Sequence, residues 1–295
     1  MDGAVGVERM GEPATQHEEV NALHSLRRHW PEYLMEAGEL ALFMISACVF
    51  ATLLQHPASP VRHAIAGELP RRMLMGMAMG STAIAIVMSP WGKQSGAHFN
   101  PAVTLTFFRL GKVRPMDALF YVASQFVGGI VGVIVATVLL HGAVAHNAVH
   151  YVTTVPGHHG VAIAFAAELI ISFGLMTTVL VVSNREAVAR YTPYCVGALV
   201  ATYICLEAPL SGMSMNPART FGSAVSAMSW NALWIYFTAP PLGMLVAAEL
   251  FLRIRGGAAP KCAKLHHANN KRCIFRCGYM QPPEPNQSLI KEYSK

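Results

Sequence analysis

Two short segments of the chain carry the same motif: SGAHFNPAVTLTFFR at residues 95–109 and SGMSMNPARTFGSAVSAM at residues 211–228. When they are aligned on Asn100 and Asn216, both have Ser, Gly, Asn, Pro, Ala and Thr at matching positions. Such internal similarity indicates a chain built from repeated structural units. We therefore expect two related halves, each containing one copy of the motif.

Both motif segments are apolar, yet each is shorter than the ~20 residues that a helix needs to cross a bilayer. Other parts of the chain are long enough, and the composition of 53% hydrophobic and 13% charged residues is typical of a membrane protein. The sequence predicts an all-α membrane protein with six transmembrane helices and two re-entrant half-helices. The six predicted spans cover residues 33–54, 73–89, 116–141, 161–183, 193–209 and 231–253.

The position of the motifs predicts a pore. Each copy follows two spans and precedes a third, so the second copy must be inverted and the two loops must enter from opposite faces. Pro suits the first position of a helix, which makes Asn100 and Asn216 the N-caps of two half-helices. Irregular backbone at that depth is tolerated only where it is buried in protein or lines a cavity. We expect the cavity on the pseudo-twofold axis between the halves.

Charge at the centre of this pore would select against ions. Each half-helix N-terminus carries about +0.5 of an elementary charge, which opposes cations, including hydronium. The amides of Asn100 and Asn216 can donate to a passing oxygen and so interrupt a chain of water molecules. Arg219 follows the second motif where the first has Val103, and an intramembrane Arg is costly enough to indicate function. An alternative role for Arg219 is to tie its loop to a carbonyl group.

Basic residues between the spans predict the orientation, because Lys and Arg concentrate on the cytosolic side. The loops after the second and fourth spans are basic, which places both termini in the cytosol of a multi-pass protein of the cell (plasma) membrane. We divide the chain into a cytosolic tail (1–32), a channel domain (33–254) and a second cytosolic tail (255–295). The basic loop residues are Lys93, Arg109, Lys112, Arg114, Arg185 and Arg190, whereas Arg62, Arg71 and Arg72 lie on the predicted outer side.

Several classes of function are disfavoured. Aspartate occurs only at Asp2 and Asp117, so there is little to build a buried proton relay or a catalytic triad. Without a nucleophile and base in the pore, we expect no enzyme. The basic residues lie in loops and tails as membrane orientation requires, and no nucleic-acid partner is expected.

Buried carboxylates are expected to support the loops. Glu36 and Glu168 occupy equivalent places in the first and fourth spans, where each can accept hydrogen bonds from backbone N–H groups of a re-entrant loop. Glu207 is expected either to bind Arg219 or to be solvated. Glu249 has Arg253 four residues further along as a partner on the same helix face. Glu39 has no assigned role.

With these motifs in hand, the chain resembles the major intrinsic protein family, the aquaporins and glycerol facilitators, over about residues 33–254. The resemblance implies a right-handed six-helix bundle with two half-helices, usually a homotetramer with one pore per subunit, in which His98 has a structural role. It rests on the two Asn-Pro-Ala boxes Asn100, Pro101, Ala102 and Asn216, Pro217, Ala218, together with Arg219, Glu36, Glu168, His98 and Gln125.

The resemblance also places a selectivity constriction at Arg219, Met213, Ile204 and either Met79 or Gly80. Water-selective members typically carry Phe and His at the second- and fifth-span positions, so this constriction is less polar. Thr220, Ala224, Tyr236 and Phe237 instead match water channels. The predicted function is passive passage of water, with or without small neutral solutes, excluding ions and protons. The alternative is a facilitator of glycerol, ammonia, hydrogen peroxide or another small neutral solute.

The C-terminal tail contains a second pattern, KCAKLHHANNKRCIFRCGYM at residues 261–280. Cys262, His266, Cys273 and Cys277 form a C-x3-H…C-x3-C arrangement, with His267 as an alternative ligand. In a reducing cytosol this favours a metal, and Zn²⁺ prefers such ligands. Free thiols or redox sensing are the alternatives to a metal site. The Cys/His tail also leaves open a different class of function, that of a metal- or redox-responsive membrane protein. Transport itself requires no cofactor, and residues 281–295 are expected to be disordered.

Overall fold

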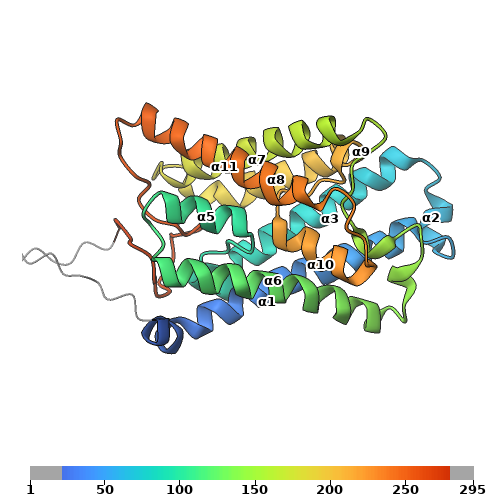
Figure 1. The fold of residues 1–295 in the computed structure, drawn as a ribbon, viewed down its shortest axis with the longest axis horizontal. Helices are drawn as coiled ribbons and strands as arrows, with labels where there is room; N and C mark the ends of the chain where they lie inside the picture. Colours follow the sequence, from blue (N-terminus) through green and yellow to red (C-terminus); the bar gives the residue numbers. More distant parts are fainter. Residues whose placement is uncertain (1–21, 280–295) are drawn as a thin grey trace, which may run out of the picture.

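The computed structural model describes residues 22–279, and all regular secondary structure in that range is helical (Figure 1). The α-helices are α1 (Ala22–Gln55), α2 (Pro60–Ala64), α3 (Glu68–Met88), α4 (Pro90–Ser95), α5 (Pro101–Arg109), α6 (Pro115–Leu139), α7 (Val161–Ser183), α8 (Thr192–Leu206), α9 (Ala208–Ser211), α10 (Pro217–Ala227) and α11 (Leu233–Ile254). Short 3₁₀ turns cover Ala143–Ala145, His150–Val152 and Ala189–Tyr191.

The six predicted spans are confirmed as α1, α3, α6, α7, α8 and α11, and the motif segments as the half-helices α5 and α10. Within residues 22–279, four helices, α1, α6, α7 and α11, are long and apolar enough to cross a membrane by length and composition alone. Helix α8 is shorter than predicted because the chain turns at Glu207, and α3 carries charged residues in its first turns.

The predicted boundary at residue 32 falls inside α1, which begins at Ala22 and continues through Pro31. Residues 22–32 are therefore helix, and buried His29 connects them with α6: its Nδ1 lies 2.7 Å from Asp117 Oδ1, to which the hydroxyl of Tyr33 also donates at 2.6 Å. The remaining parts of the predicted tails, 1–21 and 280–295, including the segment expected to be disordered, lie outside the described residues.

Packing between the long helices follows the internal repeat. Gly128 of α6 lies against the carbonyl of Ala37 in α1, and Gly243 of α11 lies against that of Leu169 in α7, so a Cβ at either glycine would meet backbone. Small residues let membrane helices approach this closely. Because the same contact occurs in both halves, the duplication extends beyond the two motifs to the helix bundle.

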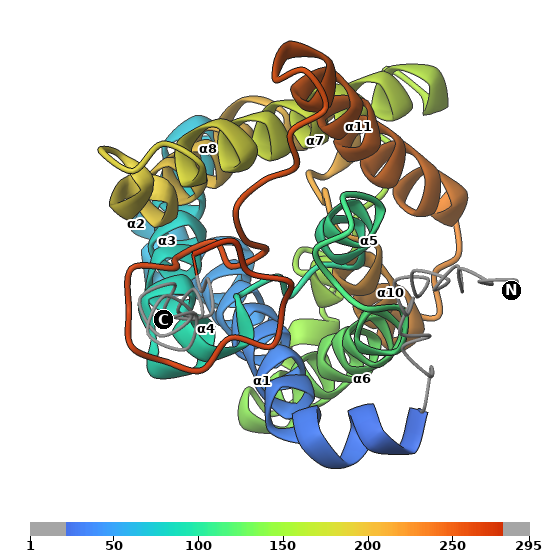
Figure 2. The same ribbon diagram turned by 90° about the vertical axis from the view of Figure 1, so that its left-hand side faces the viewer.

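The halves also exchange their half-helices. Half-helix α5 of the first half packs against α11 of the second, and α10 of the second half packs against α6 of the first. Figure 2 looks along the bundle, with α7, α8 and α11 on one side and α1, α3 and α6 on the other. This exchange brings both half-helix N-termini into the middle of the molecule.

The C-terminal segment 258–279 contains no helix or strand and folds back over one end of the bundle, beside α4 and α1 (red in Figure 2). Arg272 anchors it to α1: its Nη2 lies 2.5 Å and its Nε 2.9 Å from the carboxylate oxygens of buried Glu32. The segment buries Cys262, Ala263, Leu265, Ile274 and Phe275. It is therefore packed on the channel rather than extended away from it.

Candidate functional site

The two half-helices begin at Asn100 and Asn216, as predicted. The side-chain oxygen of Asn100 accepts from the backbone N–H of Ala102 at 2.9 Å, and that of Asn216 accepts from Ala218 at 3.0 Å and Arg219 at 3.2 Å. Pro follows each Asn at the first helical position, where its missing N–H costs nothing. Both motifs thus form N-caps in the middle of the bundle.

The same two side chains connect the loops to each other. Asn100 Nδ2 donates to the carbonyl oxygen of Met215 at 2.8 Å, and Asn216 Nδ2 donates to that of Phe99 at 2.7 Å. A side-chain amide has two N–H donors, so each Asn keeps one donor after this contact. Both residues line the central cavity, where the second donor can reach a solute oxygen.

Both glutamates predicted to support the loops accept hydrogen bonds from loop backbone. Glu36 accepts from the backbone N–H of His98 at 2.9 Å and of Phe99 at 2.7 Å. Glu168 makes the equivalent bonds to Ser214 and Met215, both at 2.7 Å. Because both carboxylates are fully buried, they satisfy loop donors that lipid or a dry interior would leave unpaired.

These bonds hold an unfavourable backbone in place. Ala97 and Phe99 have φ of 57° and 30°, and Met213 and Met215, at the equivalent positions of the second motif, have φ of 53° and 55°. Positive φ costs a non-glycine residue about 1–3 kcal/mol and persists only where the surroundings enforce it. The carboxylates supply that constraint at matching places in both halves.

Polar side chains beneath the first loop form a connected chain. Gln125 Nε2 donates to Glu36 at 2.7 Å and to the Thr104 hydroxyl at 3.0 Å. That hydroxyl lies 3.1 Å from His98 Nδ1, while His98 Nε2 lies 2.9 Å from the carbonyl oxygen of Ala263. A carbonyl can only accept, so Nε2 carries the proton and Nδ1 accepts from Thr104. Both ring nitrogens of His98 are thus engaged in hydrogen bonds within the protein.

Two other carboxylates are paired differently from the sequence prediction, and a third gains a partner that was not predicted. Glu207 is buried and accepts from the Ser211 hydroxyl, so it neither binds Arg219 nor is solvated. Glu249 pairs with Arg109 at 2.6 Å rather than with Arg253, because α5 packs beside α11. Glu39, which had no assigned role, accepts from the Ser95 hydroxyl at 2.7 Å and supports the first loop.

A cavity of about 460 Å³ runs between the halves and is lined by both motif asparagines. Four residues of the predicted constriction line it: Met79, Ile204, Met213 and Arg219. Gly80, the alternative to Met79, instead packs against the carbonyl of Gly197 in α8. Arg219 Nη1 donates to the carbonyl of Val152 at 2.7 Å. Arg219 therefore both binds a backbone carbonyl and lies on the cavity wall.

Sequence reasoning missed part of the lining. Met75 could have been found, since it lies one helical turn before Met79 on the same face of α3. Leu265 could not, because nothing in the tail pattern connects it with the pore. The further lining residues that were not predicted include Phe43, Arg72 and Val152.

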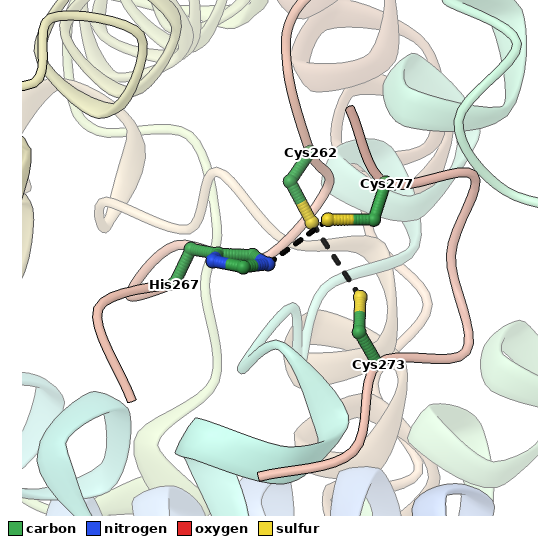
Figure 3. A group of neighbouring side chains, drawn as sticks. All are labelled: Cys262, His267, Cys273 and Cys277. Carbon is green, nitrogen blue, oxygen red and sulfur yellow. Dashed lines mark hydrogen bonds between the residues drawn. The ribbon is translucent and has the colours of Figure 1, made fainter. Parts of the chain in front are cut away.

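A second cluster lies in the C-terminal segment. Figure 3 shows Cys262, His267, Cys273 and Cys277, whose ligand atoms all lie within 4.8 Å of one another. His267 takes the place predicted for His266, which is not part of the group. The ring of His267 lies against Cys277, whereas His266 Nδ1 is buried without a hydrogen-bond partner in the described structure.

Two of the thiols interact directly. The Sγ atoms of Cys262 and Cys273 are 3.6 Å apart, and the hydrogen bond between them lowers the pKa of Cys273 to about 4 while it raises that of Cys262, which is also buried. His267 Nε2 lies 3.0 Å from Cys277 Sγ. The cluster thus brings together sulfur and imidazole ligands of the kind that bind soft metal ions.

The helices and loops together define a multi-pass membrane protein with two re-entrant half-helices around a central cavity. The chain belongs to the major intrinsic protein family, whose model matches residues 27–251. Relatives include aquaporin NIP2-3 of Zea mays, 36% identical over 63% of this chain and 60% of that protein, and aquaporin NIP6-1 of Arabidopsis thaliana, 34% identical over 60% of this chain and 57% of that protein. The similarity thus spans about 60% of the length of these relatives.

The fold is also similar to that of a solved structure, the aquaglyceroporin from Plasmodium falciparum, with a TM-score of 0.62 over 77% of this chain and 97% of that one. At 20% sequence identity this similarity concerns the fold alone. It agrees with the all-helical fold class predicted from the sequence.

Proposed function

We propose that the protein is a passive channel for water and small neutral solutes. The observation that carries this proposal is the reciprocal contact of Asn100 and Asn216, which joins two half-helix N-termini on the wall of one cavity. Together the N-termini give a positive potential, so cations and hydronium are repelled. The amide donors turn a passing water so that it donates outward in both directions, which breaks a proton wire.

The constriction sets the range of solutes. Met79, Ile204 and Met213 present apolar surface, and Arg219 supplies a charged donor beside them. An apolar wall with few polar groups admits an uncharged solute with a small carbon skeleton as well as water. We therefore propose water as the principal solute, with glycerol-sized neutral molecules as accompanying ones. No catalytic group or cofactor is needed for such transport.

The outer surface supports a membrane location. Helix α6 exposes Val127, Val131, Ile134 and Val138, which follow one another at intervals of three or four residues and form an apolar stripe. Such a stripe suits lipid or another subunit. We propose a homotetramer in the cell membrane with both termini in the cytosol, in keeping with the basic loops after α3 and α7.

Stopped-flow light scattering on proteoliposomes tests the proposal. Vesicles that contain the protein should shrink faster than empty vesicles after a jump in an impermeant osmolyte, and should reswell in glycerol. Shrinkage at the rate of empty vesicles would contradict the channel function. Glycerol reswelling without fast water flow would contradict the assignment of water as the principal solute. A protein-free reconstitution with the same lipid serves as the control.

A further inference from the structure

The cluster in the C-terminal segment has the dimensions of a metal site. A tetrahedral Zn²⁺ with sulfur ligands at about 2.3 Å places those ligands about 3.8 Å from one another. The Sγ atoms of Cys262 and Cys273 are 3.6 Å apart, and all four ligand atoms lie within 4.8 Å of one another. Three cysteines with one histidine is an established ligand set of structural zinc sites.

We propose that Cys262, His267, Cys273 and Cys277 bind one Zn²⁺ ion, which fixes the C-terminal segment on the pore. Zinc fits because thiolate and imidazole ligands are soft, whereas Mg²⁺ and Ca²⁺ take oxygen ligands. Cys262 is buried and the other three ligands are half-buried, so the site is closed on one side by the channel itself.

A metal crosslink would stabilise the segment, because the segment has no regular secondary structure of its own. Residues 258–279 contain no helix or strand, and two of their backbone hydrogen bonds go to the channel: Leu265 donates to Gly96 at 3.1 Å and Arg276 donates to Lys112 at 2.9 Å. A metal bound by four residues would close short loops in a segment that lacks a core. In small domains of this kind the free energy of metal binding is folding free energy.

The residues between the ligands contact the pore. Ala263 and Leu265 lie between Cys262 and His267: the first accepts a hydrogen bond from His98 Nε2, and the second lines the cavity. Phe275 lies between the other two ligands, and its ring stacks on that of His98 with centroids 5.3 Å apart and planes at 11°. Each half of the metal site is thus connected with the first re-entrant loop.

The consequence for transport rests on the channel function proposed above. With the metal bound, Leu265 is held on the cavity wall beside the first loop and narrows that mouth of the pore. Without the metal, the segment loses its crosslink and Leu265 can leave the wall. We expect permeability to rise when the metal is removed.

Metal binding is measured on the purified full-length protein, stripped with a chelator and titrated with Co²⁺ and then Zn²⁺. About one ion per chain should bind, with the absorption of tetrahedral cobalt thiolate, and Zn²⁺ should displace it. Cys273→Ser and His267→Gln should weaken binding at least roughly tenfold. Their matched controls, Cys195→Ser in α8 and His266→Gln, should bind as the wild type does.

Three outcomes would overturn the site: no bound ion in the wild type, loss of binding in His266→Gln but not in His267→Gln, or loss of two thiols to a disulfide in place of metal uptake. Flux through the same stripped and zinc-loaded preparations then tests the second part. Faster water flow after stripping supports it, and equal flow with the ion bound overturns the narrowing of the mouth. If metal binds but neither preparation conducts, the channel function fails and the metal site stands.

Discussion

His98 Nε2, in the first re-entrant loop, donates a hydrogen bond of 2.9 Å to the carbonyl oxygen of Ala263, 165 residues further along the chain. The contact joins the pore to the C-terminal segment and brings Leu265 onto the cavity wall. Two parts of the sequence with separate motifs thus meet at one mouth of the channel. The size of the side chain at residue 265 should therefore affect conduction.

Leu265→Ala should raise water permeability roughly twofold, because the width of the lining controls what passes through a pore. Leu265→Met, which keeps the volume of the side chain, is the matched control and should conduct as the wild type does. Osmotic shrinkage of proteoliposomes with equal protein content gives the comparison. Equal rates for Leu265→Ala and the wild type would contradict a role for this residue in the wall.

Arg219 should control leakage of charge more than the flow of water. Its replacement in Arg219→Val removes a fixed positive charge from the cavity wall, and proton flux should rise roughly tenfold, which corresponds to a barrier about 1.4 kcal/mol lower. The positive half-helix ends remain, so exclusion should be weakened rather than lost. A pH-sensitive dye inside the vesicles reports the flux, with exposed Arg253→Val as the control. Proton flux as low as in the wild type would show that Arg219 has no part in exclusion.

Glu36 should contribute more to stability than a surface carboxylate. In Glu36→Ala the N–H groups of His98 and Phe99 lose their acceptor, at a cost of about 1–3 kcal/mol for each buried donor. Glu249→Ala, which removes an exposed ion pair with Arg109, should cost about 0–1 kcal/mol. Thermal unfolding in detergent, followed by loss of the monodisperse species, separates the two. A Glu36→Ala protein as stable as Glu249→Ala would contradict the support role.

The parts of the site that could be predicted are those that occur in both halves of the internal repeat. Asn100 and Asn216, and likewise Glu36 and Glu168, repeat in equivalent places, and the requirement that buried backbone groups be paired gives each its role. Glu249 was misassigned because a single sequence shows the neighbour four residues away, whereas its partner Arg109 comes from another helix. Glu207 was misassigned because its distance from Arg219 in space cannot be read from the chain.

The contacts of the C-terminal segment could be predicted only in part from the sequence. Its cysteines indicated a metal site, yet the choice between His266 and His267 depends on which way irregular backbone turns, and no periodicity fixes that. The contact of Leu265 with the pore depends on where the whole segment docks. Docking in turn depends on single contacts such as that between Arg272 and Glu32, which leave no pattern in the sequence.

Substitutions in the constriction should change which solutes pass through the pore. Combining Met79→Phe with Ile204→His gives the cavity wall the bulk and polarity typical of water-selective members of the family. Glycerol permeability should fall roughly tenfold, at the low end of the discrimination that a change in one apolar pocket gives, while water permeability stays within about twofold. Ile204→Val alone serves as the conservative control. Glycerol flux that is unchanged in the double variant would show that these residues do not form the narrowest part of the pore.

The ion pair between Arg272 and Glu32 should hold the C-terminal segment on the channel. Glu32 is fully buried and accepts from Arg272 and, at 2.9 Å, from Gln94 Nε2. Arg272→Gln removes the charged partner, and because the Arg272 side chain is about half exposed we expect a loss of about 1–2 kcal/mol rather than the full cost of a buried ion pair.

Limited trypsin digestion measures this loss, since cleavage of a transiently opened segment follows its equilibrium population. Cleavage after Lys261, Lys264 and Lys271 should become about 5- to 30-fold faster in Arg272→Gln. In the control Arg255→Gln, which changes an exposed residue, the same three sites should be cut at the wild-type rate. Zn²⁺ should slow cleavage in both proteins, because the ion binds only the closed segment. Faster cleavage that Zn²⁺ does not reduce would show that the ion pair holds the segment and that the metal does not.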